Sequence, residues 1–154
     1  MIQILTPLTT NRIEKSLREQ FGIEEINGKM LKLGEEKLFL FTGDASDNEI
    51  KTLEKIVPVE RIGVYFAKVV HEDIKLSIEG TQILKNQIKK NIFEVDETQA
   101  REWMEGSELN VKTGKKGFVA IKYKDNFLGC GKASEEKIGN FVPKMRRLKR
   151  KEFH

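Results

Sequence analysis

The side chains that could carry catalysis are few in this sequence, and their surroundings favour structural roles. The one cysteine, Cys130, lies in an apolar run with Lys132 as its nearby cation, so a small buried thiol is favoured over a nucleophile. His71, in the string His-Glu-Asp, could act as a general base, but a surface turn is the favoured interpretation. One cysteine and two histidines are a poor set for a structural zinc site, which usually takes four such ligands. We therefore expect no catalytic residue and no metal ion.

Two glycine–lysine strings superficially resemble phosphate-binding loops. Gly129-Cys130-Gly131-Lys132 is followed by turn and strand signals, whereas loops of that kind lead into a helix N-terminus. Glycines that let a strand bend or another backbone approach are the favoured interpretation. Gly114-Lys115-Lys116 lacks the Ser or Thr that follows the lysine of a nucleotide-binding loop, and it indicates a hairpin tip. The sequence therefore predicts no cofactor.

The excess positive charge of the chain is concentrated near its C-terminus. Residues 1–90 contain 14 Lys plus Arg and 14 Asp plus Glu, and residues 91–136 contain 7 and 9. Such a block indicates either a solvated terminus or the contact surface for a polyanion, most often nucleic acid, and composition alone favours neither. Residues 137–151 contain no acidic residue and 7 basic ones: Lys137, Lys144, Arg146, Arg147, Lys149, Arg150 and Lys151.

Length and composition suit a small folded protein. The 154 residues are enough for one ordinary domain or two small ones, and 38% hydrophobic residues can supply a core. The longest uncharged apolar stretches, such as residues 38–41 and 63–67, fall far short of the roughly 20 residues of a membrane-spanning helix. Because the N-terminus carries no pattern of a secretion signal, we expect a cytoplasmic protein.

Two helices are predicted in the N-terminal region. Thr9 or Thr10 can cap the first, and Gly22 is placed to end it. The apolar residues at four-residue spacing in this helix are Ile13, Leu17 and Phe21. Residues 46–49 fit a capping box that opens a second helix, which Pro58 closes.

Strand patterns alternate with these helices. Asn27-Gly28 accepts the positive φ angles of a tight hairpin turn, and His71-Glu72-Asp73 gives the turn of a second hairpin. The predicted strands span residues 23–26, 29–33, 38–41, 59–70 and 74–78.

The C-terminal region is predicted to contain one more helix and several short strands spaced as in a small barrel. The polar run 85–91, after helical spacing that begins beyond Gly80-Thr81, is the best candidate for a domain boundary. Asp96 caps a helix with Gln99 at its third position, and Glu105-Gly106-Ser107 ends this helix. Short strands are predicted at residues 92–95, 109–111, 118–123, 126–130 and 140–142. We therefore predict an α+β fold, with an N-terminal sandwich-like α/β domain of antiparallel strands at 1–90 and a β pseudobarrel at 91–154.

Three aromatic residues are candidates for contact with a partner molecule. Trp103, at the end of the C-terminal helix, is expected in the core rather than on a stacking surface for a base. Tyr65 and Phe66 are neighbours in a strand and point to opposite faces, so one ring is expected to be exposed or covered by the other domain. An exposed ring there would support an alternative function, a protein-interaction adaptor whose basic terminus only aids solubility.

Several short sequence motifs occur here in an order known from one protein family. They are Gly63, Phe66-x-Lys68, Leu76, Leu84, Glu105-Gly106, Val111-x-x-Gly114 and Leu128-Gly129-x-Gly131. In this order and spacing the chain resembles, essentially end to end, the Nip-seven family of large-subunit ribosome-assembly factors. Proteins of that family have an α/β pre-PUA domain followed by a PUA domain, named for pseudouridine synthase and archaeosine transglycosylase. The resemblance implies RNA binding in ribosome biogenesis and rRNA processing.

The closing segment carries a second resemblance. Residues 137–147 are similar to the end of the PUA-type extensions on RNA 5-methylcytosine methyltransferases. In those proteins this string belongs to an RNA-binding module fused to a separate catalytic domain, and this sequence has no glycine-rich cofactor loop for such a domain. Two alternatives stay open, a free-standing assembly factor and a stand-alone RNA-binding partner of a methyltransferase. Both imply RNA.

The resemblance also implies where RNA binds. PUA domains use the glycine-containing loop after their first helix and the neighbouring final strand, which map onto residues 105–107 and 140–148. Lysines and arginines would contact phosphates, and Asn140 with backbone groups near Gly106 and Gly129 would contact bases or sugars. The implied RNA-binding residues are Gly106, Ser107, Lys132, Lys137, Asn140, Lys144, Arg146, Arg147, Lys149, Arg150 and Lys151. We expect a non-catalytic protein whose partners are RNA, with ribosomal RNA as the expected class, and other ribosome-assembly or RNA-modification proteins.

Overall fold

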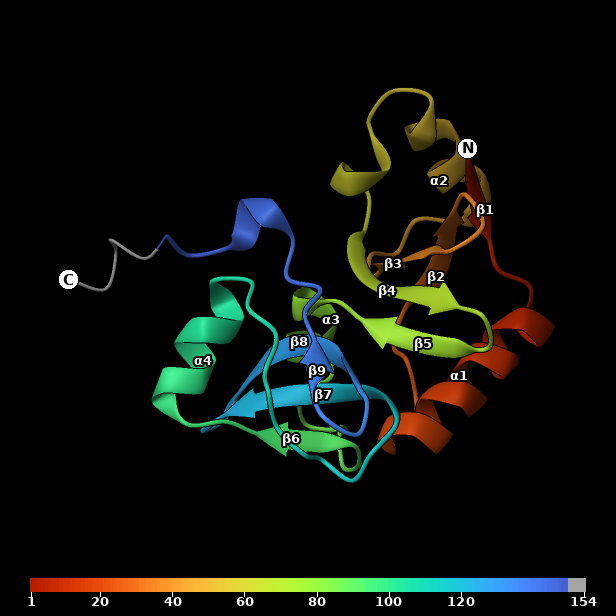
Figure 1. Ribbon diagram of the computed structural model, residues 1–154. Helices are drawn as coiled ribbons and strands as arrows, with labels where there is room; N and C mark the ends of the chain where they lie inside the picture. The colour runs from red at the N-terminus through yellow and green to blue at the C-terminus, as the bar shows by residue number, and fades with distance from the viewer. Residues whose placement is uncertain (150–154) are drawn as a thin grey trace.

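The computed structural model describes residues 1–149 and contains two β-sheets with helices packed around them (Figure 1). The first region comprises β1 (Ile2–Ile4), α1 (Pro7–Phe21), β2 (Lys29–Leu33), β3 (Lys37–Phe41), α2 (Asp47–Glu54), the 3-10 helix η1 (Val59–Arg61), β4 (Val64–Val70), β5 (Asp73–Leu76) and α3 (Ile78–Ile83). The second comprises β6 (Ile92–Glu94), α4 (Glu97–Met104), β7 (Gly117–Tyr123), β8 (Asn126–Ala133), β9 (Ile138–Gly139) and the 3-10 helix η2 (Lys144–Arg146). The predicted α+β class is confirmed.

Helix α1 begins about one turn before the predicted caps. The Thr6 hydroxyl accepts a hydrogen bond from the Thr9 N–H at 3.3 Å, and Pro7 occupies the first turn, where its missing N–H costs nothing. The expected cap at Thr9 or Thr10 is therefore wrong. Gly22 ends the helix in the left-handed conformation with φ +75, as predicted. The predicted apolar face is buried and consists of Ile13, Leu17 and Phe21.

The five strands of the first sheet lie in chain order, β1-β2-β3-β4-β5, and every neighbouring pair is antiparallel. Residues 23–26 form no strand, so the hairpin predicted across Asn27-Gly28 is wrong, and the tight turn lies at residues 34–36. Gly28 is needed for a different reason. An added Cβ would lie 2.6 Å from the Phe41 carbonyl oxygen, so the glycine allows close approach of two backbones.

Three further elements of this region differ in extent from the prediction. Helix α2 opens with the predicted capping box but ends before Ile56, whose side chain is 73% exposed. Strand β4 begins only at Val64, because η1 occupies the start of the strand predicted from residue 59. Helix α3 begins earlier than predicted, capped by Ser77, and Ile88 lies beyond its end. The predicted hairpin formed by β4 and β5 is confirmed.

The second sheet has the order β6-β7-β8-β9 and curls into a half-barrel, as expected for a PUA-type fold. Strand β6 runs parallel to β7, and the other neighbours are antiparallel. Asp96 and Gln99 form the predicted capping box of α4. Two strand predictions are wrong here, because residues 109–111 contribute only an isolated bridge from Leu109 and residues 140–142 form no strand. With no strand before it, the loop at Gly114 is a connection rather than a hairpin tip.

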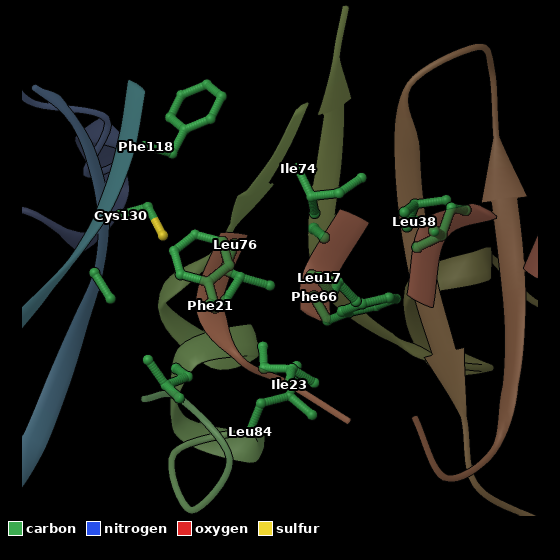
Figure 2. Packing of buried hydrophobic residues seen from close by; sticks show 14 of the residues in the cluster. Leu17, Phe21, Ile23, Leu38, Phe66, Ile74, Leu76, Leu84, Phe118 and Cys130 are labelled. Carbon is green, nitrogen blue, oxygen red and sulfur yellow. The ribbon is translucent and has the colours of Figure 1, made fainter. Parts of the chain in front are cut away.

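A hydrophobic cluster fills the space between the two sheets. It combines residues of α1 and the first sheet with Phe118, Ala120, Phe127 and Cys130 of the second sheet. Figure 2 shows Phe21 and Leu76 between Cys130 on one side and Leu38 on the other. The boundary between domains at residues 90 and 91 stays a prediction, and apolar contact is continuous across it. Within residues 1–149, no helix is long and apolar enough to cross a membrane.

Candidate functional site

The loop that follows α4, residues 105–107, is called the glycine loop below. Backbone hydrogen bonds hold it at the end of that helix. The Gly106 N–H donates to the Trp103 carbonyl at 3.0 Å, and the Ser107 N–H donates to the Glu102 carbonyl at 2.9 Å. Gly106 has φ +98, which side chains rarely tolerate. Trp103 is fully buried, as predicted, and its indole N–H donates to the Leu128 carbonyl at 2.9 Å. The core of the second region therefore fixes the predicted glycine loop.

Asn140 joins this loop to the C-terminal segment, by which we mean residues 140–149. Its amide nitrogen donates to the Trp103 carbonyl at 2.8 Å and to the Ser107 carbonyl at 2.9 Å. Its amide oxygen accepts from the Val142 N–H at 2.7 Å, which turns the backbone away from strand geometry. Both amide donors are thus engaged within the protein. Asn140 positions the loop, while the oxygen retains one lone pair for a ligand.

Arg147 is seated directly over Gly106. Its Nε donates to the Val142 carbonyl at 3.0 Å. An added Cβ on Gly106 would lie 2.5 Å from that Nε, so the absent side chain makes room for the guanidinium. The Leu148 N–H donates to the Met104 carbonyl at 2.8 Å and secures the segment against the end of α4. The two parts of the predicted RNA surface therefore touch each other.

The other predicted cations lie in different electrostatic settings, and Lys132 and Lys137 line a separate hollow at the β8–β9 turn. Arg146 forms an ion pair with Glu79 of α3, and Lys137 pairs with Glu108 at 3.0 Å. The Lys132 ammonium lies 5.9 Å from the centre of the Phe118 ring. Lys144, on η2, and Lys149 are exposed on the C-terminal segment. Arg150 and Lys151 lie outside the described residues.

Of the two side chains considered for catalysis, Cys130 is buried and His71 is exposed in a turn. Cys130 is buried in β8, and this burial raises the pKa of its thiol to about 12, which leaves almost no thiolate near neutral pH. Gly131 beside it lets the strand pack closely, since an added Cβ would lie 2.6 Å from the Trp103 side chain. His71 is exposed in the turn between β4 and β5, where it has φ 57, so the predicted surface turn is confirmed. Among residues 1–149, no group of three or more His, Cys, Asp or Glu is placed to hold a metal ion.

Neither ring of the Tyr65–Phe66 pair is fully exposed. Phe66 is 0% exposed in the core cluster between the sheets. Tyr65 is partly buried, with its ring centre 5.5 Å from that of Phe39. Of the two expected outcomes, a ring covered by the other region is confirmed for Phe66, whose cluster includes residues of the second sheet. The fully exposed ring on which the adaptor alternative depended is found at neither Tyr65 nor Phe66.

Sequence reasoning missed a second group of side chains near the C-terminal segment. Phe141 is 41% exposed and faces lysines of the first sheet across a cleft. The lysines are Lys37, Lys68 and Lys75. They are scattered in the sequence, and only the pairing of β3, β4 and β5 brings them together.

The second region is similar to a known protein domain. Residues 90–148 match the family model described as the PUA domain of the methyltransferase RsmF. The resemblance to methyltransferase PUA extensions is thus confirmed at the level of the domain. The resemblance to the Nip-seven family stays a prediction.

Distant similarity to the same methyltransferase extends over most of the chain. It is 24% identical over 132 residues to the ribosomal RNA small subunit methyltransferase F of Vibrio vulnificus strain YJ016, covering 86% of this chain and 27% of that protein. It is 28% identical over 145 residues to the enzyme of the same name from Psychromonas ingrahamii, covering 88% of this chain and 29% of that protein. The chain therefore spans less than a third of the length of these relatives.

Proposed function

We propose that this chain binds RNA without catalysing a reaction on it, and that its target is ribosomal RNA during ribosome biogenesis. The observation that carries the proposal is the match of residues 90–148 to a PUA domain, combined with a basic segment folded across the glycine loop of that domain. The names of the relatives point to ribosomal RNA as the class of target. The buried thiol of Cys130 argues against a role as nucleophile.

A second candidate is an RNA-binding partner that acts together with a separate methyltransferase. The similarity covers 86% of this chain but only 27% of a ribosomal RNA methyltransferase, which favours a role corresponding to one part of that enzyme. Both candidates require the same RNA surface.

Lys132 and Lys144 are the best probes of this surface, because both side chains are exposed and neither forms an ion pair within the described part of the chain. Arg146 and Arg147 are less suitable because both also make contacts within the protein. Arg146 pairs with Glu79, and Arg147 donates to the Val142 carbonyl. If each lysine neutralises one phosphate of single-stranded RNA, the Lys132→Gln/Lys144→Gln variant should lose a slope of about 1.4 in log affinity against log salt. Between about 50 and 200 mM salt, that corresponds to an about seven-fold smaller loss of affinity than in the wild type.

Fluorescence anisotropy with a single-stranded fragment of ribosomal RNA measures both slopes. The matched control is Lys15→Gln/Lys55→Gln, which removes two exposed lysines from the first region. DNA of the same sequence tests whether the 2′-hydroxyl contributes. Equal slopes for the wild type and the Lys132/Lys144 variant would contradict binding at this surface. With labelled S-adenosylmethionine we expect no methyl transfer to the RNA, and stoichiometric protein-dependent labelling would contradict the non-catalytic proposal.

A further inference from the structure

Three lysines stand opposite one another on adjacent strands of the first sheet. Lys37 of β3 is paired in register with Lys68 of β4, and Lys68 is paired with Lys75 of β5. Directly opposed residues of antiparallel strands have Cα atoms about 4.5–5.5 Å apart, and like charges at such positions destabilise a sheet. We call these three residues the lysine ladder. Its cost to the sheet suggests a role other than stability.

The nearby carboxylates compensate the lysine ladder only in part. Glu36 pairs with Lys68, with 3.2 Å between Nζ and Oε2. Within residues 1–149, neither Lys37 nor Lys75 forms an ion pair with a carboxylate. The pKa of Lys75 is lowered from its ordinary value by burial, and further by the charge of Lys68. An anion beside the ladder would offset this repulsion.

The lysine ladder lines a cleft of about 200 Å³ between the first sheet and the C-terminal segment. Tyr65 and Phe141 contribute aromatic rings to the cleft, and Arg146 contributes a further cation whose charge is matched by Glu79. In Figure 1 the C-terminal segment leaves β9 between α4 and the β4–β5 hairpin. Phe141, Val142, Pro143 and Arg146 of this segment line one side of the cleft. A basic groove with aromatic rings is the usual arrangement for binding single-stranded nucleic acid.

Cations and rings continue from the cleft onto the second sheet. The Lys75 ammonium lies 4.2 Å from the centre of the Phe141 ring. The Phe141 ring is 6.1 Å from the Phe118 ring in an edge-to-face arrangement, and the Lys132 ammonium lies 5.9 Å from Phe118. The lysine ladder is thus connected to Lys132, one of the residues of the proposed RNA surface.

We propose that the cleft is a second RNA subsite, in which the lysine ladder contacts successive phosphates of a single strand and Phe141 stacks on a base. This inference rests on the proposed RNA-binding function and extends the contact from the PUA region to the first region. Three adjacent strands spread the lysines over about 10 Å, which suits a chain of phosphates better than one small anion. The aromatic ring supplies a stacking surface that every base can use.

The test compares salt dependence in the full-length protein with a 12-nucleotide oligouridylate. Replacing the lysine ladder by Lys37→Gln/Lys68→Gln/Lys75→Gln should reduce the slope of log affinity against log salt by about 2.1. Between about 50 and 200 mM salt, the affinity of this variant should then fall about eighteen-fold less than that of the wild type. The charge-matched control is Lys15→Gln/Lys55→Gln/Lys85→Gln, which removes exposed lysines outside the cleft. A ladder variant with the slope of this control would overturn the proposal.

The Lys132→Gln/Lys144→Gln variant separates this inference from the proposed function. One outcome is that the slope of log affinity against log salt is smaller for that variant than for the wild type, while the ladder variant has the slope of its control. The RNA-binding function then stands and the second subsite is wrong. If the wild type binds no oligouridylate and no ribosomal RNA fragment, both proposals are wrong.

Photocrosslinking gives a readout that does not depend on a variant. With 4-thiouridine in the oligonucleotide, we expect crosslinked peptides that contain Phe141 or Tyr65, in addition to peptides of the glycine loop. Phe141→Leu should keep the fold, remove the stacking ring and weaken binding by at least about five-fold. Crosslinks confined to the glycine loop, together with unchanged affinity of Phe141→Leu, would overturn the subsite.

Discussion

At the scale of single residues, Asn140 is the clearest case of a side chain whose role depends on its neighbours. The sequence resemblance implied contact with bases or sugars. In the structure its amide joins the end of α4, the glycine loop and the C-terminal segment through three hydrogen bonds. Its influence on RNA binding is therefore expected to act through the position of the loop.

We predict that Asn140→Ala destabilises the protein by about 2 kcal/mol or more, because the Ser107 carbonyl and the Val142 N–H lose their Asn140 partner in a partly buried site. The Trp103 carbonyl loses one of its donors and keeps the Gly106 N–H. Urea unfolding followed by circular dichroism measures the free energy of unfolding. Asn86→Ala, at an exposed position, is the matched control and should change this free energy little. Equal stability of the two variants would show that the Asn140 hydrogen bonds do not hold the loop.

At the scale of elements, the short helix α3 connects the two sheets. Its Thr81 hydroxyl donates to the Ile78 carbonyl at 2.7 Å and accepts from the Gly129 N–H of β8 at 3.2 Å, in a fully buried position. On its other side α3 packs against β4 so closely that a Cβ on Gly80 would lie 2.0 Å from the Phe66 carbonyl oxygen. The backbone of α3 can reach β4 only because residue 80 has no side chain.

We predict that Gly80→Ala destabilises the protein by about 2 kcal/mol or more, although alanine is the better helix former. The added methyl group must displace backbone rather than a flexible side chain. Gly139→Ala is the matched control, since its nearest neighbour would be an ordinary contact of 3.8 Å. Thermal unfolding of both variants checks the difference, and a Gly80→Ala variant as stable as the wild type would refute the close packing of α3.

At the scale of the whole molecule, the hydrophobic cluster between the sheets couples the two regions. Leu17 of α1 belongs to the same cluster as Phe127 of β8, although 110 residues separate them in the chain. Trp103, the one tryptophan of the sequence, lies in a neighbouring cluster of the second region. Its fluorescence therefore reports on the second region when a residue of the first is changed.

We predict that Leu17→Ala lowers the denaturation midpoint of Trp103 fluorescence as much as that of far-ultraviolet circular dichroism. Removing a fully buried leucine costs roughly 2–5 kcal/mol, and a shared core transmits this loss to both regions. Leu8→Ala on the same helix, with Leu8 63% exposed, is the control. A Trp103 transition that does not respond to Leu17→Ala would show that the two regions unfold independently.

Local signals in the sequence determined much of the secondary structure. The burial of one face of α1, its glycine end, the two capping boxes at Ser46 and Asp96, and the β7–β8 hairpin all follow from residues within a few positions of one another. Backbone hydrogen bonding and amphipathic spacing act over that range, so a single sequence contains the information. The concentration of basic residues near the C-terminus is likewise a property of the sequence itself.

Tertiary structure alone decided which distant residues meet. Strand β2 pairs with β1 and β3 rather than with residues 23–26, because strand partners compete over the whole chain and Asn27-Gly28 suits more than one backbone geometry. The lysine ladder exists only through the registers of three strands, and the seat of Arg147 only through the close approach of the C-terminal segment to Gly106. The sequence by itself thus determined the local elements and the location of the charge, whereas long-range pairing and packing decided which cations gather in the cleft and which hold the fold.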